Sequence, residues 1–121
     1  MRSLILLMIL TVTCVLSYDE KYDRLDVDAI LADDQHFTSY LDCFLDKAPC
    51  TTEYSKEFRE LLPEVIKTAC EKCSDTQKVK VRKFVKAIFE KKAEMAQEFR
   101  TKFDPTGEYE PAFLAFLKQN K

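Results

Sequence analysis

Apolar side chains recur along this chain with the period of an α-helix. Three sets return every three or four residues, so each lies on one face of a helix at about 100° per residue. The last two faces span roughly 140° of arc, wider than a minimal core-facing stripe, which indicates central helices. The sets are Phe37, Tyr40, Leu41, Phe44 and Leu45; Phe58, Leu61, Leu62, Val65, Ile66 and Ala69; and Val81, Phe84, Val85, Ile88 and Phe89.

Three shorter segments complete the predicted helices: residues 27–31, 93–103 and 109–118. Glycine occurs once, at Gly107, whereas strands joined by tight hairpins usually need glycine at their turns. No repeat, low-complexity tract or linker divides the chain. The pattern therefore predicts a single all-α domain.

Local signals at helix ends agree with this pattern, with one exception. Asp26 can cap the first short helix, and Ser74 with Gln77 forms a capping box at the start of the third stripe. Pro63 falls well inside the second stripe, where it removes a backbone hydrogen bond and crowds the carbonyl of Arg59. A kink, or two short helices, is expected there.

The first 17 residues are typical of a secretory signal peptide. Arg2 supplies a positive charge, residues 4–16 are nearly all apolar, and a polar segment begins at Tyr18. The apolar run of about 13 residues is shorter than the roughly 20 needed to span a bilayer as a helix. We therefore expect a signal peptide at 1–17, a secreted, extracellular domain at 18–121, and no stable membrane insertion.

The charge of the expected mature chain is mild. Without Arg2, 18 basic residues face 21 acidic ones, a formal charge of −3, which gives no overall attraction to nucleic acid. Cations gather in residues 78–92 and carboxylates in residues 19–34. Such runs are most often solvated helix faces, although the two can also pair with each other. One of the cations could also lie at the mouth of a cavity and meet a carboxylate.

Four cysteines remain once Cys14 leaves with the signal peptide: Cys43, Cys50, Cys70 and Cys73. In an exported protein an even set indicates disulfides, and four cysteines allow three pairings. Two short loops and a crossed pairing are both compatible with the spacing, which does not choose between them. A redox role for the last pair is disfavoured, because such motifs usually accompany an α/β fold.

No constellation of catalytic or metal-binding residues is present in the sequence. His36 is the only histidine, and no nucleophile accompanies it in a recognisable pattern. There is no phosphate-binding loop or metal-ligand cluster. We expect a protein that is not an enzyme and that needs no cofactor or metal.

Five segments, taken in order, resemble the insect chemosensory proteins, also called olfactory segment D-like proteins. The similar segments are 21–31 (KYDRLDVDAIL), 43–51 (CFLDKAPCT), 61–64 (LLPE), 70–78 (CEKCSDTQK) and 103–109 (FDPTGEY). Together with the cysteines they are highly specific, and Pro63 is then a family trait. The chain departs from the family in having 19 residues between its middle cysteines where 18 are usual, and in having no tryptophan.

The resemblance implies a compact bundle of about six helices around an apolar channel, with two short-loop disulfides, Cys43–Cys50 and Cys70–Cys73. It implies reversible binding of fatty acids, long-chain esters and alcohols, or pheromone- and odorant-like molecules. Tyr22 is the expected polar anchor, since it combines an apolar body with one hydroxyl. The expected wall residues are Tyr22, Ile30, Leu41, Leu45, Leu62, Val65, Ile66, Phe84, Val85 and Ile88.

Two alternatives stay open at this point. Periodicity cannot separate the wall of a channel from a filled core, and most residues in such stripes fill a core. The chain could also be a secreted signalling or structural protein that acts through an outer apolar patch. The residues that motivate this second reading are Phe113, Leu114, Phe116 and Leu117. We expect a monomeric carrier of a small hydrophobic ligand.

Overall fold

The computed structural model describes residues 17–119, and in that part of the chain all regular structure is helical. A short 3-10 helix, η1 (Glu20–Arg24), is followed by six α-helices. These are α2 (Val27–Ala32), α3 (Asp34–Phe44), α4 (Ser55–Thr68), α5 (Asp75–Lys91), α6 (Ala93–Phe103) and α7 (Glu110–Leu117). The prediction of an all-α bundle of about six helices is confirmed. The proposed signal peptide, 1–17, lies almost entirely outside the described residues.

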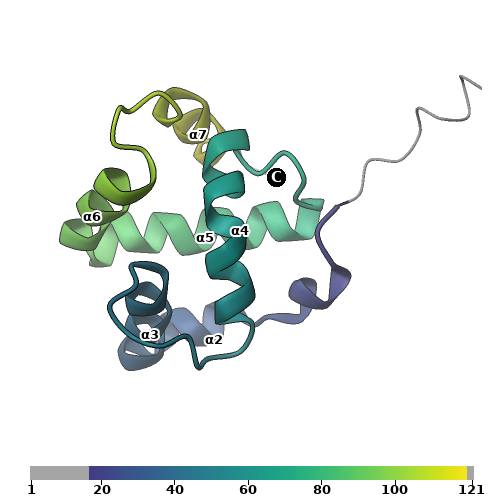
Figure 1. Ribbon diagram of the computed structural model, residues 1–121. Helices are drawn as coiled ribbons and strands as arrows, with labels where there is room; N and C mark the ends of the chain where they lie inside the picture. Colours follow the sequence, from purple (N-terminus) through teal and green to yellow (C-terminus); the bar gives the residue numbers. More distant parts are fainter. Residues whose placement is uncertain (1–16, 120–121) are drawn as a thin grey trace, which may run out of the picture.

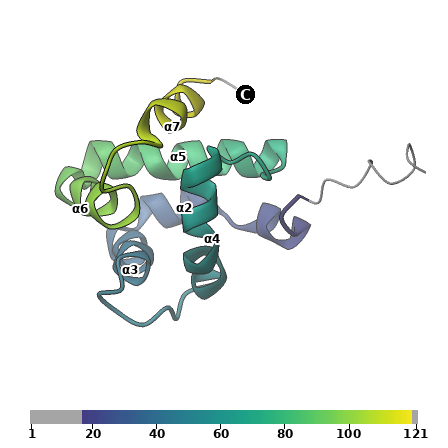
Figure 2. The ribbon, with the colours of Figure 1, turned by 45° about the horizontal axis from the view of Figure 1, so that its top comes forward.

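Helix α5 runs through the middle of the molecule (Figure 1). Helices α2 and α3 lie on one side of α5 and α7 lies on the other, as the second view also shows (Figure 2). Helix α4 crosses α5, yet it packs closely against α3 and α7 and has few close backbone contacts with α5. The space between these two crossing helices is where the apolar faces of α4 and α5 meet.

The ends of the helices follow the local signals in the sequence. The side chain of Asp26 accepts a hydrogen bond from the backbone N–H of Ala29, and Ser74 and Gln77 form the complete capping box. Pro63 is exposed and lies within one continuous helix, α4. The segment is therefore not divided into two short helices. At the end of α4, Ala69 and Cys70 have positive φ angles, which stops the helix and turns the chain toward α5.

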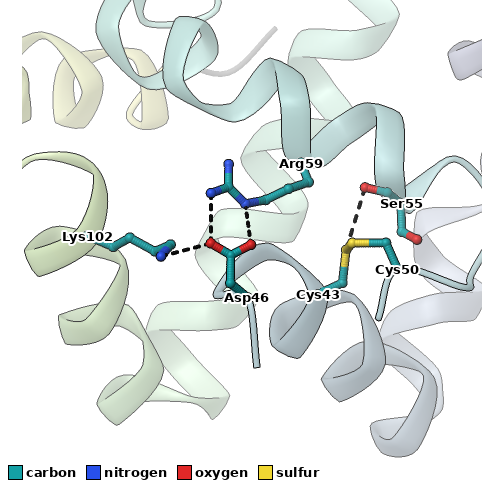
Figure 3. Close-up of polar contacts among 6 residues, drawn as sticks. All are labelled: Cys43, Asp46, Cys50, Ser55, Arg59 and Lys102. Atoms are coloured by element: carbon teal, nitrogen blue, oxygen red, sulfur yellow. Dashed lines mark hydrogen bonds and ion pairs between the residues drawn. A yellow bond between two sulfur atoms is a disulfide. The ribbon is translucent and has the colours of Figure 1, made fainter. Parts of the chain in front are cut away.

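Both short-loop disulfides are present. Cys43 is joined to Cys50 and Cys70 to Cys73, with Cα–Cα distances of 4.8 and 5.1 Å. The first bond holds the end of α3 to the loop before α4, and Cys43 Sγ lies 3.6 Å from the carbonyl oxygen of Ser55 (Figure 3). Each bond therefore fixes a local turn and does not join distant helices.

An ionic cluster next to the first disulfide joins α3, α4 and α6 (Figure 3). Asp46, at a positive φ just beyond α3, accepts hydrogen bonds of 3.0 and 2.9 Å from Arg59 and lies 2.9 Å from the ammonium of Lys102. Hydrogen bonds from Arg59 and Lys102 hold the pKa of Asp46 well below its usual range. The guanidinium of Arg59 lies over the ring of Phe103, which ties α6 to α4.

The C-terminal apolar residues do not form the outer patch that the sequence suggested. Phe116 and Leu117 are buried, and Phe113 is half-buried, so of the four only Leu114 is exposed. The buried Arg82 donates a hydrogen bond of 2.9 Å to the carbonyl oxygen of Phe116, which holds the end of α7 against α5. None of the helices within residues 17–119 is long and apolar enough to cross a membrane.

Candidate ligand-binding cavity

An apolar cavity of about 230 Å3 lies between α4 and α5 and extends to α6 and α7. Helix α5 contributes lining residues from Gln77 to Phe89, and twelve residues of helix rise span about 18 Å. The space is therefore elongated along α5. Polar side chains occur at a few positions of an otherwise apolar wall, which is the usual composition of a ligand pocket.

Helical periodicity explains how each wall is built. On α4 the lining residues are Phe58, the pair at 61–62 and the pair at 65–66, each about one turn after the last. On α6 they are Ala96, the pair at 99–100 and Phe103. Because side chains three or four apart share one face of a helix, a single face of each helix lines the whole cavity.

Seven of the ten residues expected in the wall line this cavity, and three do not. Tyr22 lies at the η1 end, and the remaining six come from the facing surfaces of α4 and α5. Ile30, Leu41 and Leu45 lie in the packed interior: Leu41 is fully buried and Ile30 is 2% exposed. Helix α3 packs closely against α2 and α4, and of its apolar stripe only Phe44, three residues after Leu41, lines the cavity. The six are Leu62, Val65, Ile66, Phe84, Val85 and Ile88.

Several lining residues were not among those expected. Val81 and Phe89 belong to the same stripe as Phe84, so the spacing could have included them. On α6, Ala96 and Phe99 follow helical spacing in a segment that was predicted to be a helix. No helical spacing in the sequence indicates Tyr18, because it lies before η1 and is placed in the wall by the course of the chain there.

Two phenols occupy the end of the cavity near η1. The hydroxyl of Tyr22 donates a hydrogen bond of 2.5 Å to Glu57, and the hydroxyl of Tyr18 donates one of the same length to Glu64. Burial, together with the Glu57 carboxylate, raises the pKa of Tyr22 to about 12, and burial together with the Glu64 carboxylate raises the pKa of Tyr18. The phenols are therefore neutral donors, and both hydroxyls are engaged with carboxylates behind the wall.

Backbone contacts fix Tyr18 in this position. Its N–H donates a hydrogen bond of 3.1 Å to the carbonyl oxygen of Lys72, inside the loop closed by Cys70 and Cys73. The side chain of the buried Gln77 donates to the carbonyl oxygens of Tyr18 and Asp19. The segment before η1 is thus anchored to the start of α5 and forms part of the wall.

The other end of the cavity is more open. Phe89 and Leu114 are the two apolar lining residues that are exposed, at 36% and 38%. Arg100 lies with its guanidinium 5.2 Å from the centre of the Phe89 ring, and its Nε is 3.2 Å from Oε1 of Glu110, one turn before Leu114. We call these four residues, from α5, α6 and α7, the mouth.

The cations of residues 78–92 have several different surroundings. Lys83 pairs with Asp28 at 3.3 Å and Lys92 pairs with Asp34 at 2.9 Å, so the basic and acidic segments do pair in part. Lys80 lines the cavity, and its ammonium donates a hydrogen bond of 2.7 Å to the carbonyl oxygen of Leu25.

Comparison with known proteins identifies the family. The model of the insect pheromone-binding family, A10/OS-D, matches residues 18–111. The chain belongs to this family. Ejaculatory bulb-specific protein 3 of Drosophila melanogaster is 37% identical to the chain over 103 residues, which are 85% of this chain and 81% of that protein. Allergen Tha p 1 of Thaumetopoea pityocampa is 30% identical over 123 aligned positions, covering 95% and 97% of the two chains.

Solved structures of chemosensory proteins have the same fold. A chemosensory protein in complex with bromo-dodecanol superposes with a TM-score of 0.72 at 28% identity, over 80% of this chain and 96% of that chain. The antennal chemosensory protein A6 of the moth Mamestra brassicae gives a TM-score of 0.67 at 28% identity, over 84% and 93%. The resemblance to chemosensory proteins is confirmed, and the family is one of binding proteins.

Proposed function

We propose that this protein is an extracellular carrier that reversibly binds long aliphatic molecules in the cavity between α4 and α5. The observation that carries the proposal is the elongated apolar cavity, whose walls are single helix faces along about 18 Å of α5. A ligand there would be held mainly by the hydrophobic effect. The bromo-dodecanol bound to a related chemosensory protein supports an alkyl chain as the occupant.

The ligands that fit are fatty acids, long-chain alcohols and esters, and pheromone- or odorant-like molecules with an extended apolar part. The walls offer few directional contacts, so selectivity among chain lengths is gradual. Each additional methylene buried contributes about 0.8 kcal/mol, or about a fourfold gain in affinity, until the chain fills the cavity. Carriage rather than catalysis is also favoured by the family, whose members are binding proteins.

A displacement titration with a fluorescent fatty-acid-like probe tests this function. Alcohols of increasing length should displace the probe with affinities that rise by about fourfold per methylene and then level off. Val85→Trp, in the α5 wall, should weaken binding by more than tenfold because the indole fills space that the ligand needs. Val79→Trp is the matched control, since Val79 is exposed on the same helix and does not line the cavity.

Saturable binding that is equally weakened by both valine substitutions would contradict the interior site. No saturable binding of any compound with 12 to 18 carbons would contradict the carrier function itself. An outer apolar patch in residues 113–117 is less well supported, since three of its four large side chains face the interior.

We also propose that residues 1–17 are a signal peptide and that the monomeric protein acts outside the cell as one domain, 18–121. The family match begins at residue 18, and the two disulfides suit an oxidising compartment. Intact-mass measurement of protein secreted by insect cells would test the cut, with a mature N-terminus at or near Tyr18 expected. Native mass spectrometry of the same sample would show its oligomeric state and any lipid bound to it.

A further inference from the structure

The two ends of the cavity differ in the charge that a ligand would meet. Among the described lining residues the cations are Lys80, on α5, and Arg100, on α6, and the carboxylates are Asp104 and Glu110, of which Glu110 pairs with Arg100. Near Lys80 the wall includes Tyr18 and Tyr22, whose hydroxyls are bonded to Glu64 and Glu57. Hydrogen bonds from these phenols lower the pKa of both carboxylates, which are therefore ionised at neutral pH.

An anionic head group is poorly placed at that end. The two phenol hydroxyls at this end already donate to Glu57 and Glu64, which also pair with Lys21 and Lys72, so neither hydroxyl is free to donate to an anion. The ammonium of Lys80 is already bonded to a backbone carbonyl, that of Leu25, at 2.7 Å. This end suits the apolar tail of a ligand or a neutral hydroxyl.

The mouth has the opposite character. Arg100 holds Glu110 through one contact, Nε to Oε1 at 3.2 Å, and its Nη1 donates a hydrogen bond of 3.3 Å to Gln97. The pair therefore does not use the two parallel hydrogen bonds through which a guanidinium can bind a carboxylate. The side chains of the pair are 42% and 40% exposed, and ion pairs so exposed contribute little to stability. The guanidinium of Arg100 also packs on the ring of Phe89, a contact that does not depend on Glu110 and that would hold Arg100 in place if another carboxylate replaced Glu110.

We infer that the mouth is a head-group site for long-chain aliphatic anions, in which the carboxylate of the ligand replaces Glu110 as the partner of Arg100. The alkyl chain then lies along α5 with its tail toward Tyr18 and Tyr22, and Phe89 and Leu114 cover its first methylenes. The inference rests on the proposed carrier function and adds to it an orientation and a preference for acids over alcohols of equal length.

Paired titrations with dodecanoate and dodecan-1-ol, at a pH where the acid is ionised, separate head-group recognition from chain burial. Arg100→Gln should weaken dodecanoate binding by about three- to tenfold and leave dodecanol within twofold, since the charge-assisted hydrogen bonds are lost and the apolar wall is kept. Glu110→Gln should strengthen dodecanoate binding, because it removes the competing carboxylate. Lys86→Gln, an equal change of charge at an exposed residue of α5 that does not line the cavity, should alter neither ligand.

Two results would overturn the inference while leaving the carrier function intact. One is an equal loss of acid and alcohol binding in Arg100→Gln, which would make Arg100 a structural residue. The other is a selective loss of dodecanoate in Lys80→Gln but not in Arg100→Gln, which would place the head group at the η1 end. If the unmodified protein binds neither these two compounds nor any other with 12 to 18 carbons, the carrier function fails instead.

Discussion

Helices α3 and α4 present apolar faces of similar spacing, but the two faces have different surroundings. On α3, which packs closely against α2 and α4, Tyr40 and Leu41 are at most 1% exposed. On α4, Leu62 and Ile66 are half-buried and face the cavity. An apolar stripe in the sequence therefore specifies which face turns inward, and it does not specify whether a partner helix fills the space in front of it.

The difference comes from how closely each pair of helices approaches. Helix α3 packs closely against α2 and α4, and only Phe44 of its apolar stripe lines the cavity, whereas α4 has few close backbone contacts with α5, the helix that its apolar face meets across the cavity. The cluster of Asp46, Arg59 and Lys102 joins the flank of α4 to α3 and α6. These contacts support α4 from its sides, so that the space between α4 and α5 stays open without a ligand.

The largest expected effect comes from one matched truncation in each region. Leu41→Ala should lower the free energy of unfolding by about 3–5 kcal/mol, because a closed core loses a side chain that is contacted on all sides. Leu62→Ala should cost about 1–2 kcal/mol, because part of that side chain already faces empty space. Urea unfolding of ligand-free protein measures both, and equal losses would remove the distinction between the two regions.

The reverse substitution, from small to large, sharpens the comparison. Ala87 and Ala96 are both buried, but only Ala96 lines the cavity. Ala87→Leu should destabilise the fold by about 1–3 kcal/mol through overpacking. Ala96→Leu should change stability by less than about 1 kcal/mol and weaken probe binding, because the added carbons occupy the cavity. Thermal unfolding and probe titration on the same samples check this, and intact affinity in Ala96→Leu would argue against α6 as a wall.

The two disulfides also differ in their relation to the cavity, because Cys73 lines it and neither Cys43 nor Cys50 does. Replacing either pair of cysteines by serine should cost about 2 kcal/mol, as expected for short loops. Only the Cys70 and Cys73 pair should also change ligand affinity, since Cys73 lines the cavity and the Lys72 carbonyl within that loop holds Tyr18. Denaturation and titration of the two double variants test this, and the opposite assignment of the affinity change would refute it.

The smallest effect is expected in alkaline solution. In unfolded protein a tyrosine ionises near pH 10, whereas the pKa of Tyr22 in the fold is about 12. Between these values the folded state keeps a proton that the unfolded state has lost, so stability falls as pH rises. Tyr22→Phe should flatten this part of the profile. Glu57→Gln should flatten it partly, while the contributions of Tyr18 and Tyr40, whose pKa values are also raised by burial, should stay.

The sequence was most informative where local chemistry decides the structure. Residues 93–103 were predicted as a helix with the bounds that the structure has, and the capping box at Ser74 marks the start of α5. Pro63 was harder to place, because a proline on the exposed side of α4 is accommodated within one helix. The pairing of the cysteines followed from the family resemblance, since their spacing allows alternatives.

Which residues line the cavity depends on how the helices pack together, and this could be predicted from the sequence only in part. Seven of the ten expected wall residues line the cavity, because α4 and α5 carry the widest faces and wide faces indicate central helices. Leu41 and Leu45 were misplaced because covering by neighbouring helices is a tertiary property. The same is true of Phe116, which periodicity could not place inside or outside.

The contact between Tyr18 and the Lys72 carbonyl has a practical consequence for work on this protein. The segment just before η1 forms part of the cavity wall. A recombinant form that begins a few residues after Tyr18 would therefore lack one end of that wall. Affinities measured on such a shortened form would therefore describe a cavity with an altered end wall.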